Sequence, residues 1–310
     1  MTPVPRLGAR TAEEGGEPPR KEGLASMIIL CADDYALTEG ISRAIGELAT
    51  AQRLTATSVL VTSAHWPAGA PRLCAHRGHL SVGLHLNLTL GAPLGPMPRL
   101  APKGTFPSLR DLIARALLGL LERDEIAAEI ARQLDRFEQG MRAPPDHIDG
   151  HQHVHALSGV RTALLQTVRR RYPNRPPLIR DPSDRIGTIT ARGLAVPKAL
   201  LVAALAVGFA GAARRLGLPA NDTFSGFSNF EDSVPFAEEL TKALSRPGRR
   251  HIVMCHPGHP DANLADLDLV VGRRRTEYDA LMRDAGLPAL IWRPSRRADG
   301  PPLDWANLED

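Results

Sequence analysis

The run His147-Ile148-Asp149-Gly150-His151-Gln152-His153-Val154-His155 decides how this chain is interpreted. It holds four of the eleven histidines, and its histidines and aspartate all fall on odd positions. Alternate side chains of a β-strand point to one face, so an extended strand would gather these imidazoles and the carboxylate. Such groups are the usual ligands of a transition metal. A histidine-rich surface loop is the alternative interpretation.

Composition favours one large soluble domain. The 310 residues are 43% hydrophobic, which allows a single α/β barrel. The net charge of +4 comes from scattered arginines with short clusters at 169–171 and 273–275, which we expect to be solvated helix faces. Without interleaved aromatic residues, they do not indicate nucleic acid. The three cysteines have no CxxC spacing and fit the reduced thiols of a cytoplasmic protein.

From Met27 onward, short apolar runs alternate with helical patterns, which is typical of a parallel sheet. A helix is expected after Thr38, with Ile41, Ile45 and Leu48 on its buried face. Strands are expected at 27–32, 57–61, 80–89, 147–155, 178–180, 223–227, 250–255 and 289–292. Further helices are expected within 109–140, where Gly140 would end the second one, and at 235–245 and 274–284.

The chain divides into three predicted regions. Residues 1–26 are rich in Pro, Gly, Glu and Arg and are expected to be a disordered extension. Residues 27–293 form the barrel domain, and residues 294–310 a loosely packed tail. The most apolar segment, 199–213, is shorter than the ~20 residues that span a bilayer, so no transmembrane segment is predicted. A buried helix is its simplest interpretation, and an apolar lid beside a cleft is the alternative.

Reactive residues follow the predicted strands in a regular way. Each lies at or just past the carboxyl end of a strand: Asp33, Asp34, His85, His151, Arg180 and His256. Active sites of β/α barrels are built at this end, because the βα loops converge there. One carboxylate with two imidazoles makes a metal site with open positions. A second carboxylate could act as general base, a histidine as acid, and Arg180 could orient a carboxylate.

Four motifs resemble those of the YdjC-like carbohydrate deacetylases, a family with chitooligosaccharide deacetylases and hopanoid-biosynthesis-associated members. They are Ala32-Asp33-Asp34-Tyr35, Gly83-Leu84-His85-Leu86-Asn87-Leu88-Thr89, the long histidine run and His256-Pro257-Gly258. The resemblance covers residues 27–290. Tyr35-Ala36 stands where Phe-Gly is more usual, and Gly150-His151-Gln152 where Ser-His-His is more usual. Neither difference removes a ligand.

The resemblance implies a distorted, TIM-like (β/α) barrel with its active site at the carboxyl ends of the strands. It implies a hydrolase of linear amide C–N bonds that removes the N-acetyl group from an N-acetylglucosamine unit. One divalent cation, Mg or Zn, would be bound by Asp34, His85 and His151, with Asp33 as base. By looser analogy, His256 would be the acid and Arg180 the partner of Asp33. The candidate substrate contacts are Asn87, His153 and His155.

The substrate is left open between two alternatives. The apolar 199–213 segment and an aromatic content of 4% favour an N-acetylglucosaminyl hopanoid glycolipid, and with it a cytoplasmic enzyme that contacts a membrane peripherally. A chitooligosaccharide is the other. A phosphoesterase on the same scaffold and a non-catalytic metal-binding protein are rival functions, although Asp33 and His256 are not needed merely to hold a cation. The oligomeric state is also open, a homodimer being one alternative.

Overall fold

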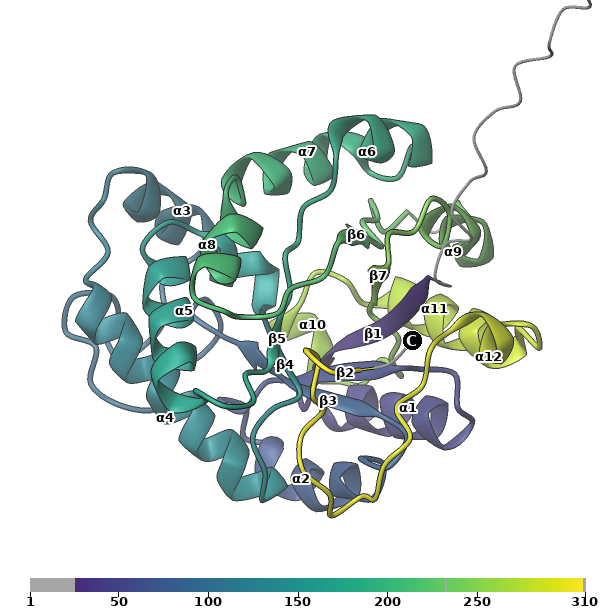
Figure 1. Cartoon of the computed structure of the whole chain (residues 1–310), viewed down its shortest axis with the longest axis horizontal. Helices are drawn as coiled ribbons and strands as arrows, with labels where there is room; N and C mark the ends of the chain where they lie inside the picture. The colour runs from purple at the N-terminus through teal and green to yellow at the C-terminus, as the bar shows by residue number, and fades with distance from the viewer. Residues whose placement is uncertain (1–25, 232, 309–310) are drawn as a thin grey trace, which may run out of the picture.

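The computed structural model describes residues 26–231 and 233–308, so the predicted disordered extension falls on residues outside the described part, apart from Ser26. Its strands form one seven-stranded parallel sheet in the order β5-β4-β3-β2-β1-β7-β6 (Figure 1). Their bounds are β1 Met27–Tyr35, β2 Ala56–Val59, β3 Ser81–Leu86, β4 His147–Gly150, β5 Leu178–Ile179, β6 Thr223–Ser225 and β7 Arg250–Cys255.

The sheet curls until its two edges meet. The N–H of Ile179 in β5 donates to the carbonyl of Pro219 at 2.8 Å, and Ile179 forms a parallel bridge with Ala220, just before β6. The N–H of Asp181 donates to the Asn221 side-chain oxygen at 2.7 Å. Because these contacts join β5 to the segment that leads into β6, the strands enclose an interior, and the predicted distorted TIM-like barrel is confirmed.

Helices connect the strands as the alternating pattern predicts. Thr38 caps α1 by accepting a hydrogen bond from the Ile41 N–H, and Ile41, Ile45 and Leu48 are buried as expected. The helices are α1 Glu39–Thr50, α2 Trp66–Cys74, α3 Leu109–Leu117, α4 Arg123–Met141, α5 Val160–Arg171, α6 Ile186–Arg192, α7 Val196–Leu205, α8 Phe209–Arg215, α9 Phe236–Ala243, α10 Leu264–Leu267, α11 Gly272–Arg283 and α12 Leu287–Leu290.

Gly140 does not end α4, contrary to the prediction. The helix continues to Met141 and ends at Arg142, which takes the left-handed conformation with a φ of 54°. A Cβ on Gly140 would lie 2.6 Å from the Trp66 ring of α2. The glycine is therefore explained by the close approach of two helices rather than by a helix stop.

The histidine-rich run is a strand only as far as Gly150, so the prediction of one strand over 147–155 is wrong. From His151 to Ala156 the chain forms a 3-10 turn (η1), in which Gln152 and His153 have φ values of 53° and 59°. The turn packs back on the strand, since a Cβ on Gly150 would lie 2.8 Å from Nδ1 of His155. The four imidazoles therefore do not share one face.

The carboxyl-terminal part of the chain also differs from the prediction. Residues 287–290 form α12 instead of starting a strand. The tail is not loosely packed, because Leu303 and Trp305 are buried. The Trp305 indole N–H donates to the Asp146 carbonyl at 2.5 Å, and the Leu303 N–H donates to the Asp146 carboxylate at 2.9 Å. Since Asp146 directly precedes β4, this tail closes the amino-terminal end of the barrel.

Replacing Trp305 with alanine is expected to lower the free energy of unfolding by about 3–5 kcal/mol, because it removes a buried indole and leaves a cavity. Urea unfolding measures this change. Trp305→Phe is the matched control, since it keeps an aromatic ring and loses chiefly one hydrogen bond, worth about 1 kcal/mol. An alanine variant as stable as the phenylalanine variant would show that the tail does not support the barrel.

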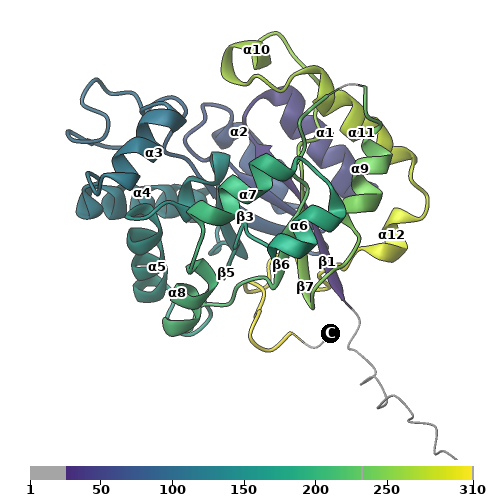
Figure 2. The same cartoon turned by 90° about the horizontal axis from the view of Figure 1, so that it is seen from above.

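The apolar segment forms two helices and is largely uncovered. Among the described residues, one stretch, Val196–Arg215, is long and apolar enough to cross a membrane by length and composition, with a mean hydropathy of 1.8. It is broken between α7 and α8 at Gly208, which has a φ of 79°. Only Ala199 is buried in α7, whereas Leu201 and Val207 are 59% and 73% exposed. The expectation of a buried helix is therefore wrong for α7, which lies beside α6 (Figure 2).

Candidate metal and catalytic site

Three predicted ligands converge at the carboxyl end of the sheet. Oδ1 of Asp34 lies 3.3 Å from Nε2 of His85 and 3.1 Å from Nδ1 of His151. One donor atom from each residue lies within 4.8 Å of the other two. Asp34 and His85 are buried, whereas His151 remains partly exposed. One carboxylate oxygen and two imidazole nitrogens at this spacing fit a single divalent cation, with access from the side of His151.

A bulge at the end of β1 separates the two neighbouring aspartates. The pairing of β1 with β2 shifts register between Ala32 and Tyr35, and Asp34 has a φ of 70°. A positive φ is uncommon for a residue other than glycine, and bulges often re-aim side chains next to active sites. As a result, Asp34 faces the two histidines, while Asp33 faces the barrel interior and Arg180.

Asp149 fixes the orientation of His85. The two residues pair across β3 and β4, and Nδ1 of His85 donates to Oδ1 of Asp149 at 2.6 Å, which leaves Nε2 free to face Asp34. Burial lowers the pKa of His85, but the charge of Asp149 and the hydrogen bonds to Asp149 and Asp34 outweigh burial and raise the pKa to about 10. A carboxylate that orients a ligating histidine is a usual support of metal sites. Sequence reasoning did not assign Asp149 this role.

Arg180 holds the predicted base. Its two terminal nitrogens each lie 2.7 Å from a different oxygen of Asp33, and Nη2 also forms an ion pair with Asp149 at 2.5 Å. The Ser58 hydroxyl donates to Asp33 at 3.2 Å. Arg180 is completely buried, so its charge is balanced by these two carboxylates rather than by water. The structure thus places Asp33 and Arg180 together, as expected.

His256 follows β7 and lies partly buried near both aspartates. Burial lowers its pKa to about 4, although the charges of Asp34 and Asp33 act in the opposite direction, so the ring is neutral at pH 7. Its backbone N–H donates to the buried carboxylate of Glu277 at 2.6 Å. The Phe230 ring packs edge-on against the imidazole, with ring centres 5.5 Å apart. The loop is therefore anchored while the imidazole remains near the site.

The three candidate substrate contacts differ in what their side chains already bind. The Asn87 amide donates to Thr62 and to the carbonyl of Leu90, at 2.8 and 2.7 Å, so it braces the loop after β3. His155 is fully buried and donates from Nε2 to the Arg180 carbonyl at 2.9 Å. His153 packs edge-on against Phe224 and Phe227, and the residue is half-buried. Among the three, His153 is the side chain best placed to meet a substrate.

The cluster at 273–275 was expected to be a solvated helix face, but only Arg275 is exposed. Arg273 and Arg274 are buried, and they form ion pairs with Glu239 at 2.7 Å and with Asp34 at 2.6 Å. Desolvated guanidinium groups require such partners, and the partners lie far away in the sequence. No local pattern could have indicated these contacts.

The sequence assigned no role at the site to Lys198 or Phe230. Nζ of Lys198, in α7, lies 4.5 Å from the centre of the Phe230 ring, which in turn packs against His256. Phe230 has a φ of 59°, a strained value for a bulky side chain. Burial lowers the pKa of Lys198. Through these contacts, the apolar insertion between β5 and β6 reaches the candidate site.

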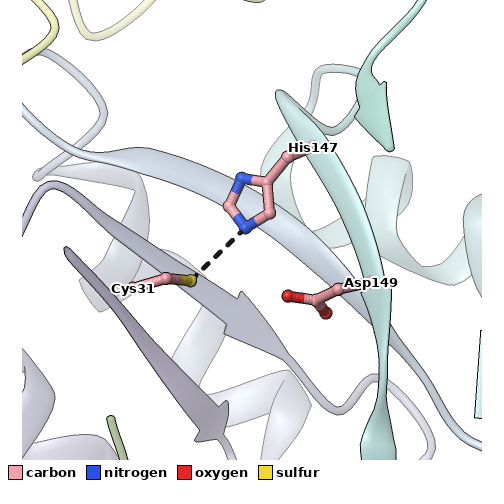
Figure 3. A group of neighbouring side chains, drawn as sticks. All are labelled: Cys31, His147 and Asp149. Atoms are coloured by element: carbon pink, nitrogen blue, oxygen red, sulfur yellow. Dashed lines mark hydrogen bonds between the residues drawn. The ribbon is translucent and has the colours of Figure 1, made fainter. Parts of the chain in front are cut away.

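A second group of metal-binding residue types lies deeper in the barrel. Figure 3 shows Cys31 on β1 facing His147 on β4, with Asp149 farther along β4. Burial raises the pKa of the Cys31 thiol, so it stays protonated, and Asp149 is already paired with His85 and Arg180. His147 forms a hydrogen bond with the Ser81 hydroxyl at 3.0 Å. This group fits a buried polar network under the site better than a metal site.

The chain matches the family described as YdjC-like protein over residues 27–290. It is 30% identical over 238 residues to a chitooligosaccharide deacetylase of Klebsiella pneumoniae (strain 342), covering 77% of this chain and 84% of that protein. It is 29% identical to a carbohydrate deacetylase of Homo sapiens, covering 75% of each. It is 39% identical over 137 residues to a chitooligosaccharide deacetylase of Proteus mirabilis (strain HI4320), covering 44% of this chain and about half, 53%, of that protein.

A similar fold occurs in the crystal structure of a proposed cellobiose-phosphate cleavage protein of Enterococcus faecalis V583. The TM-score is 0.66 at 20% sequence identity, covering 84% of this chain and 92% of the other. At this identity the likeness concerns the fold, and it agrees with a curled parallel sheet surrounded by helices.

Proposed function

The chain belongs to the YdjC-like protein family, and we propose from this premise that it is a carbohydrate deacetylase that removes the N-acetyl group from an N-acetylglucosamine-containing substrate. The observation that carries the proposal is the convergence of Asp34, His85 and His151 beside the base candidate Asp33. This arrangement supplies a cation site and a proton acceptor at the end of the barrel where β/α-barrel enzymes carry out their chemistry.

The residues divide the hydrolysis between them. A divalent cation at Asp34, His85 and His151 would polarise the acetamide carbonyl and make an attacking water more acidic. Asp33, held by Arg180 and Ser58, takes the proton of the water that attacks the carbonyl carbon. When the C–N bond breaks, the departing nitrogen needs a proton, and His256 is placed to deliver it. Because this ring is neutral at pH 7, the proton that Asp33 takes from the water passes to His256 before His256 gives it to the departing nitrogen.

The donor set favours zinc over magnesium as the cation. Two of the three candidate ligand atoms are imidazole nitrogens. Imidazole suits zinc and neighbouring transition metals, whereas magnesium prefers oxygen ligands in an octahedral arrangement. We therefore propose zinc, bound by Asp34, His85 and His151.

An apolar carrier on the sugar, such as a hopanoid, is the substrate that the surroundings favour. Leu201 and Val207 are exposed on the insertion that carries Lys198 to the site. The Val207 carbonyl accepts a hydrogen bond from Arg161, near the start of α5, which places this part of the insertion on the same end of the barrel as the candidate site. An apolar carrier would gain about 25 cal/mol for each Å² buried on this surface, and the surface would also suit peripheral contact with a membrane.

Measuring acetate release tests both the deacetylase activity and the preference for a substrate with an apolar carrier. We expect a higher kcat/KM on an N-acetylglucosaminyl glycolipid than on di-N-acetylchitobiose, and no phosphate release from a sugar phosphate monoester. Combining Leu201→Ser with Val207→Ser should lower kcat/KM for the glycolipid about tenfold and leave that for chitobiose unchanged, since about 60 Å² of apolar contact corresponds to a tenfold effect. Leu290→Ser, on exposed α12, is the matched control and should change neither value.

The outcomes distinguish a failure of the apolar-carrier proposal from a failure of the deacetylase proposal. Equal efficiency on both N-acetylated substrates, or a preference for chitobiose, would overturn the apolar carrier and leave the deacetylase standing. No acetate from either compound, together with phosphate released from the ester, would overturn the deacetylase itself.

A further inference from the structure

The two carboxylate oxygens of Asp34 have different partners. Oδ1 faces the imidazoles of His85 and His151, at 3.3 and 3.1 Å. Oδ2 accepts a hydrogen bond from Nη2 of Arg274 at 2.6 Å. Both Asp34 and Arg274 are almost completely buried, so bulk water does not screen the pair. One oxygen is therefore available to a cation and the other is bound by a guanidinium.

We propose that Arg274 is a positioning residue that restricts Asp34 to one metal-binding oxygen. As a result, the site binds the cation less tightly, and the bound cation polarises the substrate more strongly. The inference rests on the proposed function, because it assumes a cation at Asp34, His85 and His151. It concerns a residue outside the ligand set, on α11, which is separated from Asp34 by 240 positions in the sequence.

The balance of buried charges supports this role. Three carboxylates lie at the site, on Asp33, Asp34 and Asp149, and Arg180 pairs with the first and the last of them. Arg274 is the guanidinium that pairs with Asp34. A positive charge on the same carboxylate as a divalent cation repels that cation strongly in a medium of low dielectric constant. It also draws negative charge away from the ligand, so the cation is neutralised less and acts as a stronger Lewis acid.

Asp268 supplies an internal comparison. Nη2 of Arg274, the same nitrogen that binds Asp34, also forms a hydrogen bond with Asp268. Asp268 therefore competes with Asp34 for one donor, and its side chain is 18% exposed at the edge of the site. The Arg274 carbonyl accepts from the Gly258 N–H at 2.9 Å, so its backbone is fixed to the loop that carries His256. Removing the Asp268 carboxylate should leave Asp34 as the carboxylate that receives the full charge of Arg274.

The test measures zinc affinity on the metal-stripped full chain, by titration against a chromophoric chelator, and kcat for acetate release on the reloaded enzyme. Arg274→Gln should bind zinc at least tenfold more tightly and show a kcat at least tenfold lower. Asp268→Asn should bind zinc more weakly. Arg274→Lys, which keeps the charge, should lie closer to the unchanged protein in both values. A residue that merely supports the fold would lower affinity and kcat together.

Several results would overturn the inference. One is weaker or unchanged zinc binding by Arg274→Gln. Another is unchanged or tighter zinc binding by Asp268→Asn. If Arg274→Gln does not fold, the result for Asp268→Asn decides alone. A chain that binds no zinc would overturn it as well. If the affinities shift as expected but no variant releases acetate, the role of Arg274 stands and the proposed deacetylase fails.

Discussion

Replacing Asp33 with asparagine is expected to leave the cation bound and to lower kcat by about 10²-fold or more, the usual size of a general-base contribution. The amide cannot accept the proton of the attacking water. The proposed ligand set does not include residue 33, because both oxygens of Asp33 are directed at Arg180. Steady-state acetate release and elemental analysis of the same preparation measure the two effects.

The Asp33→Asn variant is expected to fold, because Arg180 keeps its ion pair with Asp149 and is not left as an unpaired buried charge. Asp222→Asn, on a half-exposed carboxylate paired with Arg250, is the control and should change neither property. Turnover by Asp33→Asn at the normal rate would exclude Asp33 as the base. Loss of the cation would instead make it a ligand.

Replacing His151 or His85 with alanine is expected to weaken metal binding by more than about 100-fold, since loss of a ligand should exceed the 10–100-fold cost of losing one of its outer partners. His151→Ala is the cleaner variant, because its ring is partly exposed and contacts Asp34. His85→Ala also removes the partner of buried Asp149 and should lose stability.

Metal content by elemental analysis measures the result for both variants. His76→Ala, at a half-buried histidine that packs edge-on against His79 before β3, is the control and should retain one equivalent. The ligand assignment is wrong if both His85→Ala and His151→Ala also retain one equivalent of metal.

The sequence predicts the sheet and the place of the site well, and the reason is local. A run such as Met27–Tyr35 is buried on both sides of the strand, so its apolar character is visible without knowledge of the fold. Once strands and helices alternate, parallel topology brings every carboxyl strand end to one edge. The convergence of Asp34, His85 and His151 follows from those two facts.

The features of the fold and the site that the sequence does not predict depend on contacts between distant segments. The turn after Gly150 exists because His155 packs back against the strand. The ion pair between Arg274 and Asp34 joins residues that are far apart in the sequence of the barrel domain. Trp305 is buried because the tail packs against Asp146 at the amino-terminal end of the barrel, and no local pattern in the sequence describes that contact. The apolar α7 illustrates the same limit, because hydropathy predicts burial and the structure leaves Leu201 exposed.

The dependence of acetate release on bound zinc tests the central claim most directly. The full chain is stripped with a chelator, exchanged into metal-free buffer and titrated with zinc in the presence of an N-acetylglucosaminyl substrate. A single site at Asp34, His85 and His151 predicts no acetate release without metal and activity that rises to a plateau at one equivalent of zinc. Full acetate release by the metal-free protein, or a plateau reached only at two equivalents, would contradict the account.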